Sequence, residues 1–90
     1  MSPFFILYLM FFTYIIYSDS YKQFYVGSTQ DFEERLRRHN ADHSKSTKGK
    51  GPWKLMVTFP FTTRAEAMEL EKKIKKRGIR RFIDEIAKPG

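Results

Sequence analysis

Two short segments of β-branched and aromatic residues constrain the fold of this chain most. Residues 13–17 and 23–27 are of this kind, and polar residues separate them. Such segments favour β-strands, and a short polar stretch between them indicates a turn, so the pair predicts a β-hairpin. With residues 18–21 as a four-residue loop, Tyr14 lies opposite Tyr25. Directly opposed residues share a face of the sheet, which predicts that the two tyrosines stand side by side.

The rest of the chain predicts one more strand and three helices. In chain order we expect a helix over residues 32–40, a polar loop over 41–52, and a strand over 53–61 that is broken by Pro60 near its end. Two further helices are expected over 64–77 and 79–87. Asp31 with Glu34, and Thr63 with Glu66, have the spacing of helix N-caps, and Gly78 ends the longest helix. Ninety residues suffice for one hydrophobic core. The chain therefore predicts a single α+β domain with the order β-β-α-β-α-α.

The N-terminal part of the chain is apolar. Residues 1–18 carry no charged side chain, and residues 4–17 are almost all apolar or aromatic. A membrane-spanning helix needs about 20 such residues, and the basic start of a signal peptide is missing. We interpret residues 1–9 as an apolar extension or arm and place the domain at residues 10–88. A membrane-tethered adaptor is the alternative that this run leaves open.

The charge of the chain indicates a polyanionic partner. The net charge is +7. Residues 35–54 contain seven Lys and Arg and one acidic residue, Asp42, and residues 72–81 contain seven Lys and Arg and no acidic residue. Clustered cations displace counterions from nucleic-acid phosphates, although a merely solvated basic surface is the alternative. The absence of cysteine is typical of a cytoplasmic protein.

Arg35 and His39 are candidates for chemistry because they lie four residues apart on the first predicted helix. A guanidinium group suits a phosphate oxygen, and a histidine with a pKa near 6.5 can carry a proton. An ordinary solvated basic helix, including the neighbouring Arg37 and Arg38, is the alternative interpretation.

Glu71 is a candidate metal ligand on the second helix. It lies at the edge of the apolar stripe formed by Ala67, Leu70 and Ile74. A carboxylate beside a core is costly unless it is paired or bound to a metal. The alternative is a salt bridge with Lys75, four residues on, and spacing alone favours this salt bridge.

The order of these residues resembles the GIY-YIG nuclease superfamily. Phe12-Thr13-Tyr14 and Tyr25-Val26-Gly27 are similar to its paired motifs, and Arg35, His39 and Glu71 follow in the expected order. The resemblance runs from about residue 10 to residue 86. It is closest to small stand-alone bacterial members related to the amino-terminal domain of the excision-repair nuclease and to certain homing endonucleases.

The resemblance implies a three-stranded antiparallel sheet flanked by helices and a metal-dependent endonuclease that acts on DNA. It assigns one Mg²⁺ (or Mn²⁺) to Glu71 and the scissile phosphate to Arg35, with no small-molecule cofactor. Tyr14 orients or deprotonates the attacking water with help from His39, and Tyr25 packs in the same site. Because the ordinary pKa of tyrosine is about 10, base work by Tyr14 requires a nearby positive charge to lower it.

Six further basic residues are predicted to bind the nucleic-acid backbone: Arg38, Lys45, Lys48, Lys50, Lys54 and Arg80. Many family members place an asparagine after the metal-binding glutamate, whereas this region contains Arg80 and Arg81, and Asn40 lies in another helix. A nucleic-acid-binding module of the same fold, with weak or no cleavage, is therefore the alternative function.

The sequence predicts no oligomeric state.

Overall fold

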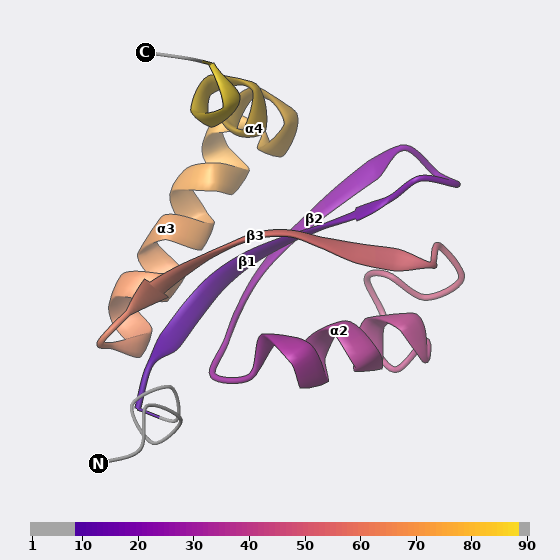
Figure 1. Ribbon diagram of the computed structural model, residues 1–90, viewed down its shortest axis with the longest axis horizontal. Coiled ribbons are helices and arrows are strands. Elements are labelled where there is room, and N and C mark those ends of the chain that lie inside the picture. Colours follow the sequence, from indigo (N-terminus) through magenta and orange to yellow (C-terminus); the bar gives the residue numbers. More distant parts are fainter. Residues whose placement is uncertain (1–8, 89–90) are drawn as a thin grey trace.

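The strands and helices follow the predicted order. The computed structural model describes residues 9–88 (Figure 1). Its elements are β1 (Phe11–Ser18), β2 (Gln23–Thr29), α2 (Phe32–Asn40), β3 (Trp53–Phe61), α3 (Arg64–Arg77) and α4 (Ile79–Ala87). The three strands form one antiparallel sheet in the order β2-β1-β3. The predicted α+β fold, with its three-stranded antiparallel sheet flanked by helices, is confirmed.

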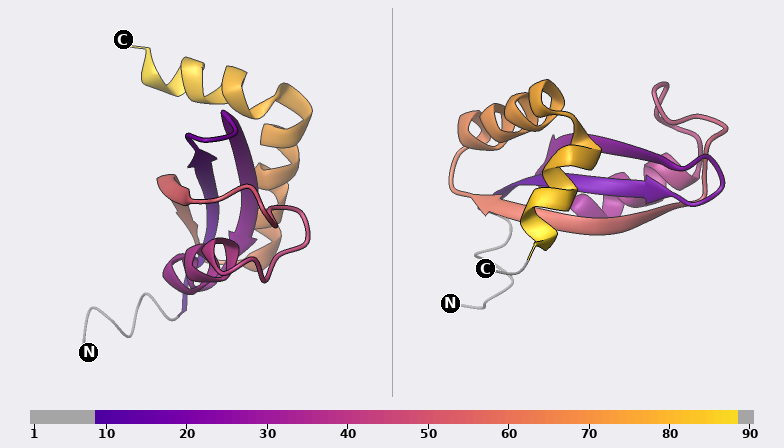
Figure 2. Two further views of the ribbon diagram at one scale, coloured as in Figure 1. Left: turned by 90° about the vertical axis from the view of Figure 1, so that its right-hand side faces the viewer. Right: turned by 90° about the horizontal axis from the view of Figure 1, so that it is seen from above.

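The central strand β1 supplies both faces of the sheet with core residues. On one face, Tyr14 and Ile16 pack with Trp53 and with partly buried residues of α2. On the other face, Ile15 packs with Val26 and with Ile74 of α3. Figures 1 and 2 show α2 on one side of the sheet and α3 on the other, with α4 continuing from α3. The period of two along β1 thus divides a small core into two layers.

The predicted hairpin register is wrong by two residues. Tyr14 lies opposite Gly27, and Tyr25 lies opposite Ile16, so the loop begins after Ser18. A slip of two residues leaves every side chain on its predicted face. Tyr14 and Tyr25 therefore share a face as diagonal neighbours, with ring centroids 6.4 Å apart. The register follows from the close approach of the Tyr14 ring to Gly27, since a Cβ atom at Gly27 would lie 2.5 Å from the Tyr14 hydroxyl oxygen.

The helices begin and end where the predicted caps stand. Asp31 accepts a hydrogen bond from the backbone N–H of Glu34 at 3.0 Å, and Thr63 accepts one from Glu66 at 3.2 Å. Gly78 separates α3 from α4 with a φ of 97°, a conformation that glycine adopts without strain. Local capping chemistry therefore fixes the bounds of α2 and α3.

The loop between α2 and β3 is held to the sheet by several hydrogen bonds. The Asn40 side chain accepts from the Trp53 N–H at 2.5 Å and donates to the Trp53 carbonyl at 3.0 Å. Ser18 donates to the carbonyl of Lys50 at 2.6 Å, and the Trp53 indole donates to the carbonyl of Thr47 at 3.3 Å. Asn40 is therefore a structural residue, and the loop has a defined position beside α2.

From Phe11 onward, the apolar N-terminal run is a sheet strand, β1. The predicted arm over residues 1–9 lies outside the described residues except for Leu9, which is exposed. Across residues 9–88, no helix combines the length and the apolar character that crossing a bilayer requires.

Replacement of Thr13 by valine should loosen the contact between the sheet and α3. The buried Thr13 hydroxyl donates to the carbonyl of Ala67 at 2.7 Å. Loss of this bond should reduce the free energy of unfolding by about 1 kcal/mol, measured by urea denaturation. Thr58→Val on β3 is the control, because it removes a less buried hydroxyl. Equal destabilisation by both variants would contradict a specific role for the Thr13 bond.

Candidate active site

Tyr14 and His39 form a buried pair on the α2 face of the sheet. The Tyr14 hydroxyl lies 2.9 Å from Nε2 of His39, and both side chains are at most 1% exposed. The Tyr25 ring lies 5.0 Å from the His39 ring, measured between centroids. Three of the residues predicted for the site are thus in contact. Strand alternation places Tyr14 and Tyr25 on the α2 face of the sheet. His39 lies seven residues after Phe32, so both point from α2 into the same layer.

His39 is almost fully buried between α2 and the sheet. Burial lowers its pKa from 6.5 to about 4, and the positive charges of Arg35 and Arg38 add to this effect. Its Nδ1 atom lies 2.7 Å from the hydroxyl oxygen of Thr47. The expected pKa near 6.5 is therefore wrong for the folded protein, and His39 is neutral at pH 7.

The pKa of Tyr14 is raised above its ordinary value of 10, mainly by burial. Hydrogen bonding and charge from Arg35 oppose this increase, whereas Tyr25 and Glu71 add to it. Arg35 does act on Tyr14 as expected, but burial outweighs it. Burial therefore favours the neutral phenol of Tyr14.

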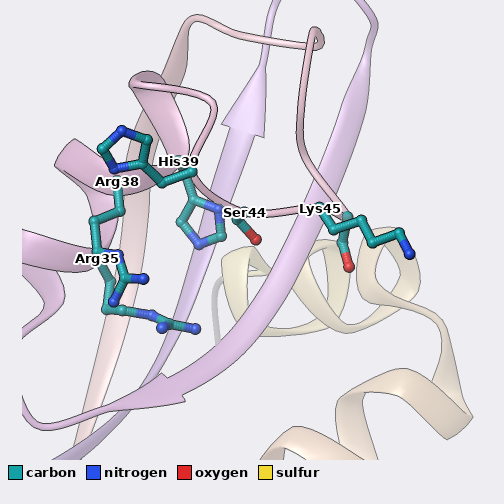
Figure 3. Close-up of a pocket in the computed structure, with 7 residues that line it drawn as sticks. Arg35, Arg38, His39, Ser44 and Lys45 are labelled. Atoms are coloured by element: carbon teal, nitrogen blue, oxygen red, sulfur yellow. The ribbon is translucent and has the colours of Figure 1, made fainter.

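A basic pocket opens beside this pair. It is lined by Arg35, Arg38, His39, His43, Ser44, Lys45 and Ser46 and has a volume of about 330 Å³. Figure 3 shows Arg35 and Arg38 extending from α2 on one side of the His39 ring, with Ser44 and Lys45 from the following loop on the other side. The Nε atom of Arg35 is buried and has no hydrogen-bond partner within the described residues. An unpaired guanidinium donor in a cationic pocket suits an anionic oxygen.

Glu71 reaches the edge of the sheet from the opposite face. Its Oε1 accepts a hydrogen bond from Ser28 of β2 at 2.7 Å, and its Oε2 accepts one from Lys75 at 2.7 Å. The ion pair with Lys75, predicted as the alternative role of Glu71, is therefore present. The hydrogen bond to Glu71 is also the main cause of the raised pKa of Lys75. Because Ser28 and Tyr25 both belong to β2, the Ser28 hydrogen bond ties Glu71 to the strand that carries this tyrosine.

The carboxylate of Glu71 suits a hard divalent cation. Among residues 9–88 there is no cluster of three or more His, Asp and Glu side chains that could enclose a metal ion. Mg²⁺ does not require one, since it commonly keeps several waters and binds through one or two carboxylates and substrate oxygens. The Lys75 ammonium group already provides a positive charge at Oε2, and its side chain is 56% exposed. The Glu71 carboxylate therefore fits a divalent cation that takes the place of the Lys75 ammonium group.

The residues predicted to bind nucleic acid are only partly gathered at the site. Arg38 and Lys45 line the pocket. Lys48 and Lys50 lie in the same loop, outside the pocket lining. The other two lie elsewhere. Lys54 pairs with Asp19 at 3.2 Å near the hairpin turn, and Arg80 of α4 lies over the Phe24 ring at 5.2 Å.

Sequence reasoning missed two hydroxyl residues that hold predicted site residues. Thr47 contacts His39, and Ser28 contacts Glu71. Ser28 directly follows the second tyrosine motif, so its position could have pointed to it. Thr47 lies in a polar loop without periodicity, where no local signal distinguishes a buried threonine from an exposed one.

The low pKa of His39 predicts a specific pH dependence of stability. Between about pH 6.5 and 4, the unfolded chain binds a proton at His39 that the folded protein does not bind. The free energy of unfolding should therefore fall as pH falls through this window, by at most about 1.4 kcal/mol per pH unit from this group. In urea denaturation at pH 7.5 and 5, His39→Gln should reduce this loss, while His43→Gln at the exposed histidine should retain it. An unchanged loss in His39→Gln would contradict the assignment.

Comparisons with known proteins identify the family. Residues 10–80 match the family described as the GIY-YIG catalytic domain. The chain is 36% identical to a UPF0213 protein of Bacillus licheniformis over 70 residues, which cover 73% of this chain and 72% of that protein. It is 36% identical to the UPF0213 protein BH0048 of Halalkalibacterium halodurans over 52 residues, 57% of this chain but only 55% of that protein.

Two further similarities concern a solved structure and a named endonuclease. The solution NMR structure of the UPF0213 protein BH0048 from Bacillus halodurans superimposes with a TM-score of 0.54 and 28% identity, covering 87% of this chain and 83% of that one. The structure-specific endonuclease subunit SLX1 of Meyerozyma guilliermondii is 37% identical over 65 residues, which are 64% of this chain and 22% of that protein. Because the family match covers most of the sequence, the chain belongs to the GIY-YIG catalytic domain family.

Proposed function

We propose that this protein is a metal-dependent endonuclease that hydrolyses phosphodiester bonds of DNA in the cytoplasm, in DNA repair or processing. Membership of a catalytic domain family supports a nuclease, and the resemblance to the excision-repair nuclease and the likeness to SLX1 favour repair or the processing of DNA structures. The proposed catalytic residues are Tyr14, Tyr25, Arg35, His39 and Glu71.

The observation that carries this proposal is the buried Nε atom of Arg35, which has no hydrogen-bond partner among residues 9–88, on a side chain that also acts on Tyr14. A buried guanidinium donor costs free energy unless a ligand satisfies it. The pocket around it is cationic, so the ligand is an anion with oxygen acceptors. A phosphate bound there by Arg35 lies next to the phenol of Tyr14. The phenol oxygen is then in position to accept a proton from the water that attacks the phosphate.

We assign the proton transfer to the Tyr14–His39 pair acting together. As the water oxygen bonds to phosphorus, a water proton passes to the Tyr14 oxygen and the phenolic proton passes to Nε2 of His39. The phosphorus–oxygen bond to the leaving group breaks, and the leaving oxygen takes a proton from solvent. This route needs no tyrosinate before the reaction, which suits the raised pKa of Tyr14. Arg35 stabilises the charge that grows on the phosphate.

Glu71 is the proposed ligand of one Mg²⁺ or Mn²⁺ ion. When bound, the metal supplies Lewis-acid stabilisation of charge on the phosphate oxygens. Ser28 holds one carboxylate oxygen in place, and displacement of Lys75 frees the other. Tyr25 packs against the His39 ring in the same site.

A DNA-binding module without efficient cleavage is the second candidate. The Glu71–Lys75 ion pair favours it, because an ammonium group at 2.7 Å satisfies the carboxylate without any metal. Dependence of cleavage on Glu71 and on a divalent metal distinguishes the two functions.

Glu71→Gln should abolish DNA cleavage while leaving DNA binding intact. The purified protein is incubated with linear, flap and junction DNA in Mg²⁺, in Mn²⁺ or in EDTA. Wild type should cut in the presence of metal only, and Glu71→Gln should lower the rate by at least about 100-fold. Glu69→Gln is the matched control, because Glu69 lies on the same helix and is 69% exposed in a long ion pair with Lys73. Equal cutting by wild type and Glu71→Gln would refute the assignment, and binding without cutting by wild type would favour the second candidate.

Neutralising Lys45, Lys48 and Lys50 to glutamine should weaken DNA binding for all sequences. These lysines lie in the loop that forms one side of the pocket, and backbone contacts carry no sequence information. In EDTA, the slope of log affinity against log salt should fall by about 1 for each DNA phosphate that the variant no longer neutralises. The control is the triple variant Lys73→Gln, Lys76→Gln and Lys88→Gln, which changes the net charge by the same amount. Its lysines are exposed and lie away from the pocket loop, two in α3 and one directly after α4. The same weakening in both triple variants would show a general charge effect and contradict a binding loop.

A further inference from the structure

Thr47 is a fully buried hydroxyl residue at the far side of His39 from Tyr14. Its Oγ1 lies 2.7 Å from Nδ1 of His39, and the hydroxyl donates to the carbonyl of Ser44 at 3.5 Å. The Tyr14 oxygen lies 2.9 Å from Nε2. The neutral imidazole therefore has a hydroxyl group at each nitrogen, and its single proton can occupy only one of them.

The surroundings of Tyr14 decide between the two tautomers. If the proton is on Nε2, His39 donates to the Tyr14 oxygen, and the buried phenolic proton then lacks an acceptor among the described residues. Arg35, which also hydrogen-bonds to Tyr14, is only a donor. If the proton is on Nδ1, Tyr14 donates to Nε2, His39 donates to Thr47, and Thr47 donates to Ser44. Every polar hydrogen in this chain of groups then has an acceptor, which buried groups strongly favour.

We propose that Thr47 is a positioning residue that holds His39 as the Nδ1–H tautomer, so that Nε2 is free to accept the phenolic proton of Tyr14. This inference rests on the proposed function for its catalytic consequence, but the tautomer itself is a property of the free protein. During the proton transfer described above, His39 becomes imidazolium and donates from both nitrogens. The Nδ1–H bond to Thr47 persists throughout, so the ring does not need to rotate. The proton taken up at Nε2 returns through Tyr14 to solvent after hydrolysis.

The tautomer can be measured without any assay of cleavage. The sequence has two histidines, His39 and the exposed His43, so ¹⁵N-histidine labelling gives two imidazole spin systems, which His43→Gln assigns. At pH 7, wild type should show a protonated Nδ1 and an unprotonated Nε2 for His39. Thr47→Ser keeps the hydroxyl and should retain this pattern, whereas Thr47→Val keeps the shape and should lose it. A proton on Nε2 of His39 in wild type would overturn the proposal even without a folded Thr47→Val variant.

Cleavage kinetics test the catalytic consequence separately. Thr47→Val should lower kcat by about 10- to 100-fold with little change in KM for DNA, and Thr47→Ser should restore most of it. An unchanged tautomer in Thr47→Val overturns the positioning role whatever the rate. If wild type has the Nδ1–H tautomer and does not cut DNA, the proposed nuclease function fails while the role of Thr47 in fixing the imidazole stands.

Discussion

The burial of the Tyr14 phenol between Gly27 and His39 is the interaction on which the rest of this structure depends. The ring lies so close to the Gly27 Cα that no side chain fits there, and this contact sets the register of the β1–β2 hairpin. The hydroxyl in turn bonds to His39, which ties α2 to the sheet and, through Thr47, ties the following loop to α2. One tyrosine thus fixes a strand register, a helix position and a loop. The same burial raises the pKa of Tyr14 and lowers that of His39, so stability and acid–base behaviour share one cause.

The fold could be predicted from the sequence because its signals are local. Asp31 and Thr63 cap their helices as their spacing indicates, and the alternation along residues 13–17 places Tyr14 and Ile15 on opposite faces. The hairpin register could not be predicted, because it depends on the close approach of one ring to one glycine across two strands. The state of His39 depends on burial by residues distant in sequence, and so does the role of Thr47. Sequence spacing alone predicts the helix face on which His39 lies, but it does not predict how deeply the His39 side chain is buried.

The edge position of β2 explains how two halves of a site on opposite faces can act together. Tyr25 of this strand points toward α2, whereas Ser28 points toward α3 and bonds to Glu71. At the edge of a sheet no further strand separates the two faces, so a carboxylate from α3 and a phenol from the α2 side can approach a common ligand. In the sheet order β2-β1-β3, the central strand could not provide this geometry. In the proposed site, the Glu71 carboxylate and the basic pocket thus lie on opposite faces of the sheet.

The low basicity of His39 in the free protein is compatible with its proposed part in proton transfer. Two of the three causes of its low pKa are the charges of Arg35 and Arg38, which also line the basic pocket. A phosphate bound in that pocket carries negative charge to the same place and offsets those two causes. In the proposed mechanism, the imidazole therefore becomes a better proton acceptor when the substrate is present, while burial keeps it neutral in the free protein. Arg35 on this view has two roles that depend on each other. It attracts the phosphate, and the phosphate then relieves the electrostatic penalty that Arg35 imposes on His39.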